Sequence, residues 1–276
     1  MGEGEARGRK RRERREAAPT LGLGVLSWGG LHSLRASLES YRVEDLFSLF
    51  DEALVFLPAM TAEGAALANE FELPYEGSAA NLGALGGFKA LAAAMTSEVL
   101  LLLENDCPLV EPRAEAARQL AFACRAVARD EVAAFRMRSI AAPGEPFPAL
   151  AAYRLLHGRG LLPGLRRALM PAEARRLAGL AVHVEPAPEQ RFPERIARTE
   201  EGWLSVSADA MPWTNQSIVV RRDFYLGVIV AEAEARPGRR RVNGFPDIET
   251  AWNSARWRGS GWRIGVDKGL FTHARL

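Results

Sequence analysis

The run of four leucines at positions 100–103, which leads straight into Glu104, Asn105 and Asp106, is the feature that most constrains the fold. A strand with one face in water alternates apolar and polar residues, whereas a strand of a parallel sheet is covered on both faces and is apolar throughout. The leucines therefore predict a central strand over residues 97–106, with helices packed on both faces of the sheet.

Three further units, each a short apolar strand followed by a helical segment, precede this strand. The strands are expected at 21–28, 51–59 and 71–77, and the helices at 31–41, 61–71 and 81–96. Four strand-helix alternations predict an α/β fold with a doubly wound, mostly parallel sheet flanked by helices. Ligands of such sheets bind beyond the carboxyl ends of the strands, where the strand order reverses. The acids that follow Leu103 lie at that edge.

The pattern changes after residue 113. The expected elements are a helix at 113–130, a half-exposed strand at 133–140, short helical pieces at 141–202, a strand at 217–225 and an amphipathic helix at 246–257. The last residues, from 265 on, are expected to form a tail. We find no repeat of fixed period, and we expect a single domain.

Residues 1–18 are rich in basic and acidic side chains and almost free of apolar ones, which predicts a disordered basic tail. A solvated arm is the favoured interpretation of this tail, although its basic residues could also make weak contact with a phosphate-rich surface, either nucleic acid or an anionic membrane. Outside it, acids and bases nearly balance, and the formal net charge of the chain is only +2, so we expect no nucleic-acid partner.

Neither a signal peptide nor an apolar stretch of the ~20 residues needed to span a bilayer is apparent, so we expect a cytoplasmic protein. Cys107 and Cys124 are too few for a disulfide framework and lack zinc-site spacing. Both are expected to be buried, reduced thiols.

Glu104, Asn105 and Asp106 would present oxygen atoms at the end of a rigid buried strand. Oxygen ligands in such a position suit a hard divalent cation, Mn²⁺ or Mg²⁺, with further coordination positions left for water and substrate. The alternative is that these residues only cap the turn before Pro108.

Several ordered features of residues 20–110 together resemble the nucleotide-binding half of family 2 glycosyltransferases with the GT-A fold. These features are GVLSW at 24–28, DEALVF at 51–56, Asn-Leu-Gly at 81–83 before a helix that carries Lys89, and the acidic end of the leucine strand. The family usually has Asp-x-Asp where this chain has Glu-Asn-Asp. The resemblance implies a nucleotide-sugar-binding half at 19–112 and an acceptor-binding half at 113–276, within one domain.

The resemblance also implies roles for residues of the first half. Asp106 would ligate the metal, and Glu104, one methylene longer than Asp, would ligate it or reach the ribose or a metal-bound water. The remaining substrate-binding candidates of this half are Ser27, Trp28, Glu52, Asn81, Lys89 and Asn105. Three of these residues could instead have structural roles only. Trp28 could lie in the hydrophobic core, Asn81 could cap a helix, and Lys89 could lie on a solvent-exposed face.

A second patch, GLFTHAR at 269–275, is similar to the C-terminal segment from which GT-A enzymes often recruit a histidine as a metal ligand. His273 is the candidate ligand here, and Arg275 could neutralise the departing diphosphate. Inverting members of the family have a catalytic base at a helix start comparable to PDIE at 246–249. Glu249 is our candidate base and Asp247 the alternate, although acids at a helix start can simply cap it.

Between these patches, Trp213, Asn215 and Gln216 could line a sugar pocket, because sugar rings favour aromatic faces and amide hydrogen bonds. The same possibility applies to the tryptophans at 203, 252, 257 and 262. Most tryptophans, however, are part of the hydrophobic core.

The resemblance implies a metal-dependent glycosyltransferase that moves a sugar from a nucleotide-diphosphate sugar donor to a saccharide or other hydroxyl acceptor, with inversion. One alternative is a catalytically silent nucleotide- or sugar-binding protein of the same fold. A nucleotidyltransferase is the other alternative, but the glycine-rich opening expected for it is missing from the first strand.

Overall fold

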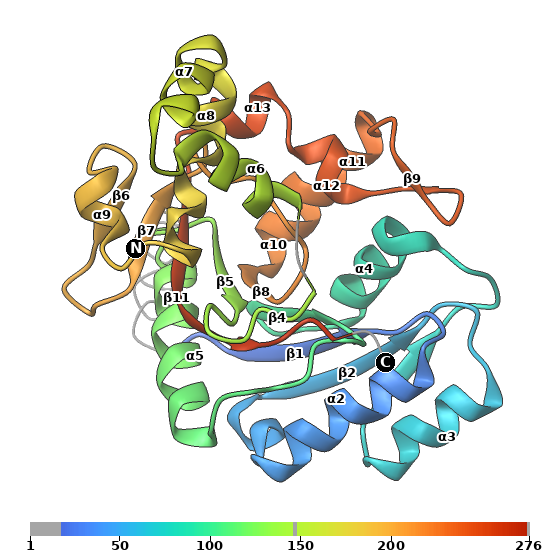
Figure 1. The fold of residues 1–276 in the computed structure, drawn as a ribbon. Coiled ribbons are helices and arrows are strands. Elements are labelled where there is room, and N and C mark those ends of the chain that lie inside the picture. The colour runs from blue at the N-terminus through green and yellow to red at the C-terminus, as the bar shows by residue number, and fades with distance from the viewer. Residues whose placement is uncertain (1–17, 146–147, 275–276) are drawn as a thin grey trace, which may run out of the picture.

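A computed structural model describes residues 18–145 and 148–274, which form one nine-stranded sheet with helices on both faces, plus a small hairpin (Figure 1). Across the sheet the strands are β3 (Tyr75–Gly77), β2 (Glu52–Leu57), β1 (Leu21–Leu26), β4 (Val99–Glu104), β8 (Ile218–Arg221), β5 (Ala134–Arg138), β11 (Arg263–Phe271), β7 (Leu204–Ser207) and β6 (Ile196–Arg198). Within this sheet, β8 and β7 run opposite to the others, so the predicted doubly wound, largely parallel α/β architecture is confirmed.

The leucine run forms β4, which lies between β1 and β8. Leu100 and Leu102 belong to one hydrophobic core, beneath the helix α4 (Gly83–Ala94). Leu101 and Leu103 belong to the other, beneath α2 (Leu31–Val43), α3 (Ala62–Glu70) and α5 (Arg113–Ala128). All four are fully buried, which stabilises the fold by about 2 kcal/mol per side chain. The prediction of a strand covered on both faces is confirmed.

The second half departs from the sequence prediction in three places. β5 is not half exposed: it lies between β8 and β11, and even Arg136 in its middle is buried. The strand expected to reach residue 225 ends at Arg221, and the chain continues as a helix through α10 (Arg222–Phe224), the π-helical η3 (Tyr225–Val230) and α11 (Ala231–Ala235). The expected C-terminal tail is largely β11, inside the sheet.

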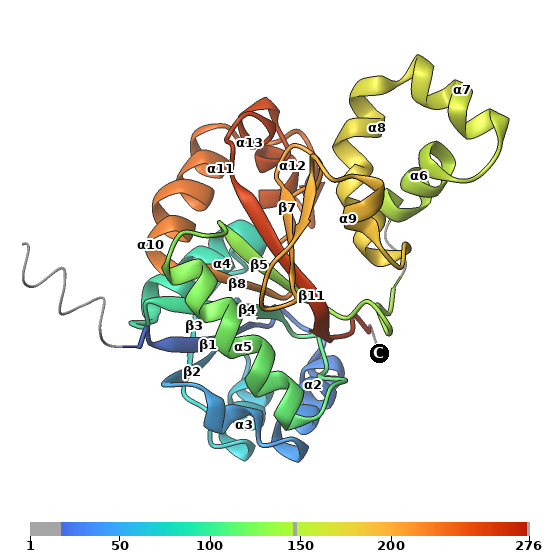
Figure 2. The same ribbon diagram turned by 90° about the vertical axis from the view of Figure 1, so that its left-hand side faces the viewer.

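The remaining elements are short. The expected helix at 246–257 is broken into α12 (Ile248–Trp252) and α13 (Ala255–Arg258), and the short hairpin of β9 (Arg241–Val242) and β10 (Phe245–Pro246) precedes it. The expected short helices after residue 141 are α6 (Pro148–His157), α7 (Leu161–Leu169), α8 (Pro171–Leu177), the 3-10 turns of η2 (Ala178–His183) and α9 (Pro188–Arg191). Figure 2 shows α6, α7 and α8 together at one end of the molecule. A 3-10 helix, η1 (Leu46–Leu49), links α2 to β2.

Three simpler expectations concern the whole chain. The thiols of Cys107 and Cys124 are free and buried, as predicted. In the described part of the chain, every helix is too short or too polar to cross a bilayer. The predicted basic tail lies outside the described residues, except for Ala18.

Candidate active site

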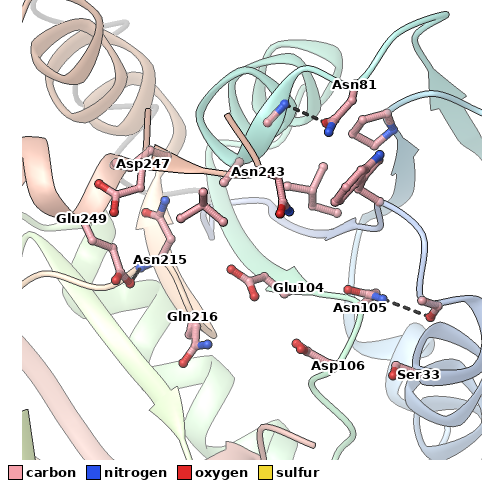
Figure 3. A pocket seen from close by; sticks show the side chains of 18 of the residues that line it. Ser33, Asn81, Glu104, Asn105, Asp106, Asn215, Gln216, Asn243, Asp247 and Glu249 are labelled. Carbon is pink, nitrogen blue, oxygen red and sulfur yellow. Dashed lines mark hydrogen bonds between the residues drawn. The ribbon is translucent and has the colours of Figure 1, made fainter. Parts of the chain in front are cut away.

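The sheet order reverses between β1 and β4, which are adjacent and parallel, with Leu26 opposite Glu104. The residues that follow both strands therefore meet at one edge, where α/β sheets usually bind ligands. A cavity of about 490 Å³ opens there, between the first half of the chain and the segments around β8 and α12. Figure 3 shows Glu104 in the middle of this cavity, with Asn105 and Asp106 to one side and Asn215 and Gln216 to the other.

A cluster of possible metal ligands lies at this edge. Ligand atoms of Glu104, Asp106 and His273 all lie within 4.8 Å of one another. The Nε2 atom of His273 is 3.1 Å from Oδ2 of Asp106, and both side chains are buried, with 7% and 6% of their surface exposed. The residues that the sequence proposed as metal ligands are therefore brought together.

Backbone hydrogen bonds hold the C-terminal segment beside the end of β4. The amide of Ala274 donates to the carbonyl of Asp106 at 2.9 Å, and that of Thr272 donates to the carbonyl of Pro108 at 3.0 Å. Val110 donates in turn to Leu270 at 2.9 Å. This ladder places the side chains of Asp106 and His273 side by side despite their distance in sequence.

Gly269 shapes the turn that brings His273 to this position. Its φ of +77° lies in the left-handed region, and a Cβ atom there would be 2.1 Å from the carbonyl oxygen of Arg138. The register between β11 and β5 shifts between Val266 and Phe271. Only glycine can approach the carbonyl of Arg138 so closely in this conformation, which explains why residue 269 of the GLFTH segment is a glycine.

The Nε2 atom of His273 has two polar neighbours. Nε2 of Gln216 lies 3.1 Å from it, and Oε1 of Gln216 accepts a 3.1 Å hydrogen bond from Arg138. The same imidazole nitrogen faces Oδ2 of Asp106. An imidazole nitrogen has one lone pair, so a metal ion bound there would take the place of a hydrogen bond from Gln216. A carboxylate beside a neutral imidazole can ligate Mn²⁺, and the two carboxylates of the cluster offer the oxygen ligands that Mn²⁺ and Mg²⁺ share.

Four candidates from the first half lie at or near the cavity. Trp28 is 48% exposed and lines the cavity together with Asn81 and Asn105. Oδ1 of Asn81 accepts a 2.9 Å hydrogen bond from the amide of Gly83, the first residue of α4, but the N-cap position is that of Leu82, so Asn81 holds the turn before the helix and is not its N-cap. Asn105 donates from Nδ2 to the carbonyl of Gly30 at 3.1 Å. Ser27 is buried and donates to the carbonyl of Gly29 at 3.2 Å.

Two other candidates do not line the cavity. Glu52 begins β2, at the opposite end of the strands, and accepts hydrogen bonds from the amides of Thr96 (2.9 Å) and Ser97 (3.0 Å). Burial acts to raise the pKa of Glu52, but these hydrogen bonds outweigh it and hold the pKa below its usual value. Lys89 forms an exposed ion pair with Glu234, at 2.6 Å. Arg275 lies outside the described residues.

The two candidate bases differ in how their oxygens are engaged. Asp247 caps α12: Oδ1 accepts from the amide of Thr250 and Oδ2 from its hydroxyl, both at 2.8 Å. Glu249 accepts at Oε1 from the hydroxyl of Thr214 (2.6 Å) and the amide of Asn215 (3.2 Å). Within the described part of the chain both of its hydrogen bonds reach Oε1, which leaves Oε2 available to a substrate.

A second cavity, of about 460 Å³, adjoins the first. Gln216, Arg240 and Glu249 line both cavities, and Trp213 and His273 line the second. Asn215 lines the first and accepts a 3.0 Å hydrogen bond from Nε1 of Trp213. Trp213 is buried edge-on against Trp257, so it is largely part of the core, as are the tryptophans at 203, 252 and 257.

The sequence analysis missed the basic residues of the second cavity, which are Arg136, Arg138, Arg176, His183 and Arg240. Arg136 and Arg138 alternate with Phe135 and Met137 along β5, so they share one face of the strand. This alternation of arginine with large apolar residues was the signal that could have found them. We interpreted the alternation as a strand with one solvent-exposed face, whereas that face of the strand forms a wall of the second cavity.

The fold is similar to that of solved glycosyltransferases. Glucosyl-3-phosphoglycerate synthase from Mycobacterium tuberculosis, in complex with Mn²⁺, UDP-glucose and phosphoglyceric acid, matches with a TM-score of 0.50 and 10% identity, over 96% of this chain and 75% of that chain. The fold is GT-A-like. The likeness expected from residues 20–110 is thus confirmed at the level of the fold.

TarS 1-349 from S. aureus matches with a TM-score of 0.48 and 11% identity, over 92% of this chain. The chain covers 60% of that TarS structure. No protein-family model matches the sequence, and no curated protein matches it.

Proposed function

We propose that this GT-A-like protein is a metal-dependent glycosyltransferase that transfers a sugar from a nucleotide-diphosphate sugar to an acceptor hydroxyl, with inversion at the anomeric carbon. One observation carries the proposal: Glu104, Asp106 and His273 converge within 4.8 Å at the edge of the sheet where the strand order reverses. M. tuberculosis glucosyl-3-phosphoglycerate synthase, which has the same type of fold, was solved with Mn²⁺ and UDP-glucose and also with Mg²⁺ and UDP.

Asp106 and His273 would hold the metal, and Glu104 would complete the set or hold the ribose or a metal-bound water. A bound Mn²⁺ or Mg²⁺ would neutralise charge on the diphosphate leaving group. Arg138 contributes indirectly, since its hydrogen bond to Gln216 fixes the amide that faces His273. Arg275 remains our candidate for a further diphosphate contact.

The nucleotide would lie between the ends of β1 and β4 and the start of α4. The exposed indole of Trp28 offers a face on which a base can stack, and Asn81 and Asn105 offer amide groups to the ribose or diphosphate. Residues 19–112 would then form the donor-binding half, and residues 113–276 the acceptor-binding half.

Glu249 is our proposed catalytic base, because it lies on the boundary of the two cavities and one of its oxygens remains for the acceptor. The acceptor oxygen would bond to the anomeric carbon as its proton passes to Glu249. The bond from that carbon to the diphosphate oxygen would break, and its electron pair would leave with the nucleoside diphosphate. A carboxylate in this role typically contributes about 100-fold to 10,000-fold to the rate.

A thermal-shift screen of nucleoside diphosphates and their sugars, with and without Mn²⁺, tests the donor class, since a ligand of the folded state raises its melting temperature. We expect at least one nucleotide to stabilise the protein only with Mn²⁺, and Asp106→Asn to abolish that effect. Asp45→Asn, an exposed acid remote from the cavity, is the matched control and should behave as wild type.

Turnover separates the proposal from its alternatives. Metal-dependent nucleotide binding without sugar transfer to any acceptor would identify a silent binding protein. Release of pyrophosphate from a nucleoside triphosphate would identify a nucleotidyltransferase.

A further inference from the structure

The two adjoining cavities carry opposite charge. The first is lined by four carboxylates, Glu104, Asp106, Asp247 and Glu249, and by one guanidinium, that of Arg240. Four guanidiniums line the second, those of Arg136, Arg138, Arg176 and Arg240, with two carboxylates, Glu145 and Glu249. An acidic cavity fits a metal ion, whereas a basic one attracts an anion.

Arg136 gives the strongest indication of an anionic ligand, because its charge is buried. Only 8% of its surface is exposed, and its guanidinium donates to the carbonyl oxygen of Pro212. The charge of Glu249, which lines the same cavity, acts on Arg136, but no ion pair within 4.0 Å is formed by Arg136 in the described ranges. A buried cation is costly unless an anion pairs with it, so the cavity is built for a negatively charged group.

The other arginines add to this field to different degrees. The guanidinium of Arg138 is held in place by the carbonyls of Pro143 and Glu145 and by Oε1 of Gln216, so it is a fixed charge. The side chain of Arg240 is 66% exposed and lines both cavities, and its Nε forms a 3.6 Å ion pair with Oδ2 of Asp247, so its outward guanidinium face serves a ligand only beside that pair. Arg176 is already paired with Glu173.

His183 in the same cavity stays neutral. Burial, and then the charges of Arg136 and Arg138, lower its pKa to about 3. Burial is the larger cause, and the two arginine charges act in the same direction, so they contribute a positive potential at His183.

We propose that the second cavity binds the anionic group of the acceptor, a phosphate or a carboxylate, through Arg136 and Arg240. This inference rests on the proposed function, because it identifies the second cavity as the acceptor site. Glu249 belongs to both cavities. An acceptor anchored by its anion in the second cavity can therefore present a hydroxyl to Glu249, at the side where the donor sugar would lie.

Anion binding can be measured without any turnover. The melting temperature is recorded against inorganic phosphate, in a chloride buffer of constant ionic strength with EDTA, so that no metal can recruit the anion to the first cavity. We expect phosphate to raise the melting temperature of the wild type in a saturable way.

The variants assign this effect to the cavity. Arg136→Gln should raise the half-saturating phosphate concentration by about tenfold or more, and Arg240→Gln by severalfold, because each removes a charge-assisted hydrogen bond. Arg239→Gln is the matched control, since Arg239 is exposed, lies next to Arg240 and lines neither cavity. If Arg136→Gln does not fold, the comparison of Arg240→Gln with Arg239→Gln decides the question. Phosphate binding by Arg240→Gln equal to that of Arg239→Gln, and equal binding by Arg136→Gln where it folds, would overturn the proposal.

A second arm separates an acceptor site from a site for the donor's diphosphate. With saturating Mn²⁺ and the nucleoside diphosphate found in the screen, phosphate should still bind and add its own shift. Mutual exclusion would show that the arginines hold the donor, and would overturn the proposal. A protein that binds no nucleotide but keeps the arginine-dependent phosphate effect in EDTA would instead contradict only the glycosyltransferase function.

Three small hydroxyl compounds distinguish the source of the anion. Glycerol 3-phosphate carries a phosphate, glycerate carries a carboxylate, and glycerol is neutral. We expect one of the two anions to stabilise the protein and glycerol to have no effect at the same concentration. A shift with glycerol as large as that with the anions would contradict the proposed chemistry.

Discussion

Nε2 of His273 lies 3.1 Å from Oδ2 of Asp106, although 167 positions separate the two residues in the sequence. The contact depends on β11, which crosses the sheet beside β5 and then pairs with the residues that follow β4. A metal bound between them would therefore tie the C-terminus to the nucleotide-binding half.

Glu249→Gln should preserve donor binding and lower kcat by at least about 100-fold, because an amide cannot take up the acceptor proton. The fold should be kept, since an amide oxygen can still accept from Thr214 and from the amide of Asn215. Asp247→Asn, which keeps the helix cap, should retain most of the activity. Steady-state kinetics on both variants decides between the two candidate bases, and the reverse ranking would assign the base to Asp247.

Gly269→Ala should destabilise the protein by more than about 1 kcal/mol, since its Cβ would be forced against the carbonyl of Arg138 in a left-handed conformation. It should also weaken Mn²⁺ binding by displacing His273. Gly261→Ala is the control: its φ is also positive, at +74°, but nothing lies within 4 Å of the added Cβ. Urea denaturation and calorimetry report the two effects, and equal losses in both variants would mean that backbone strain alone is at work.

The His183 imidazole should not titrate between pH 8 and about 4, as followed by the NMR signal of its C2 proton, because its pKa lies near 3. As the pH falls below about 6.5, the unfolded chain gains a proton at this residue and the folded protein does not, so stability is lost. Arg136→Gln should move the His183 pKa upward. An unchanged His183 pKa in Arg136→Gln would contradict the contribution of the arginine charge.

Trp28→Ala should weaken nucleotide binding by about 1 to 3 kcal/mol, the usual contribution of stacking on a base, without lowering the melting temperature. Trp28 is 48% exposed, so its removal leaves no buried void. Isothermal titration of the nucleotide identified in the screen gives the affinity. An unchanged affinity would place the base elsewhere in the cavity.

The first half of the fold could be predicted because three of its strands, β1, β2 and β4, contain local apolar runs. Leu100 to Leu103 show both buried faces in the sequence itself, and the acids after them mark the ligand edge. The metal-site residues could be named because a family resemblance linked Asp106 and His273; the 3.1 Å contact depends on long-range pairing that no local pattern contains.

The second half was harder to predict for physical reasons. β11 interrupts its apolar pattern with Asp267 and Lys268 and bends at Gly269, so it looked like a tail. Arg136 looked like a residue on a wet strand face because sequence alone cannot distinguish solvent from a charged cavity. The family resemblance implied that Glu52 and Lys89 contact the donor. In the structure Glu52 instead accepts hydrogen bonds from Thr96 and Ser97, and Lys89 forms an ion pair with Glu234.

The most direct test of the central claim is an anomalous difference map from crystals of the full chain soaked with MnCl₂ and the nucleoside diphosphate found in the screen. We predict one strong manganese peak within direct coordination distance of Asp106 and His273, with the diphosphate beside it. A manganese peak that contacts neither residue, or nucleotide bound at this edge without any metal, would contradict the account.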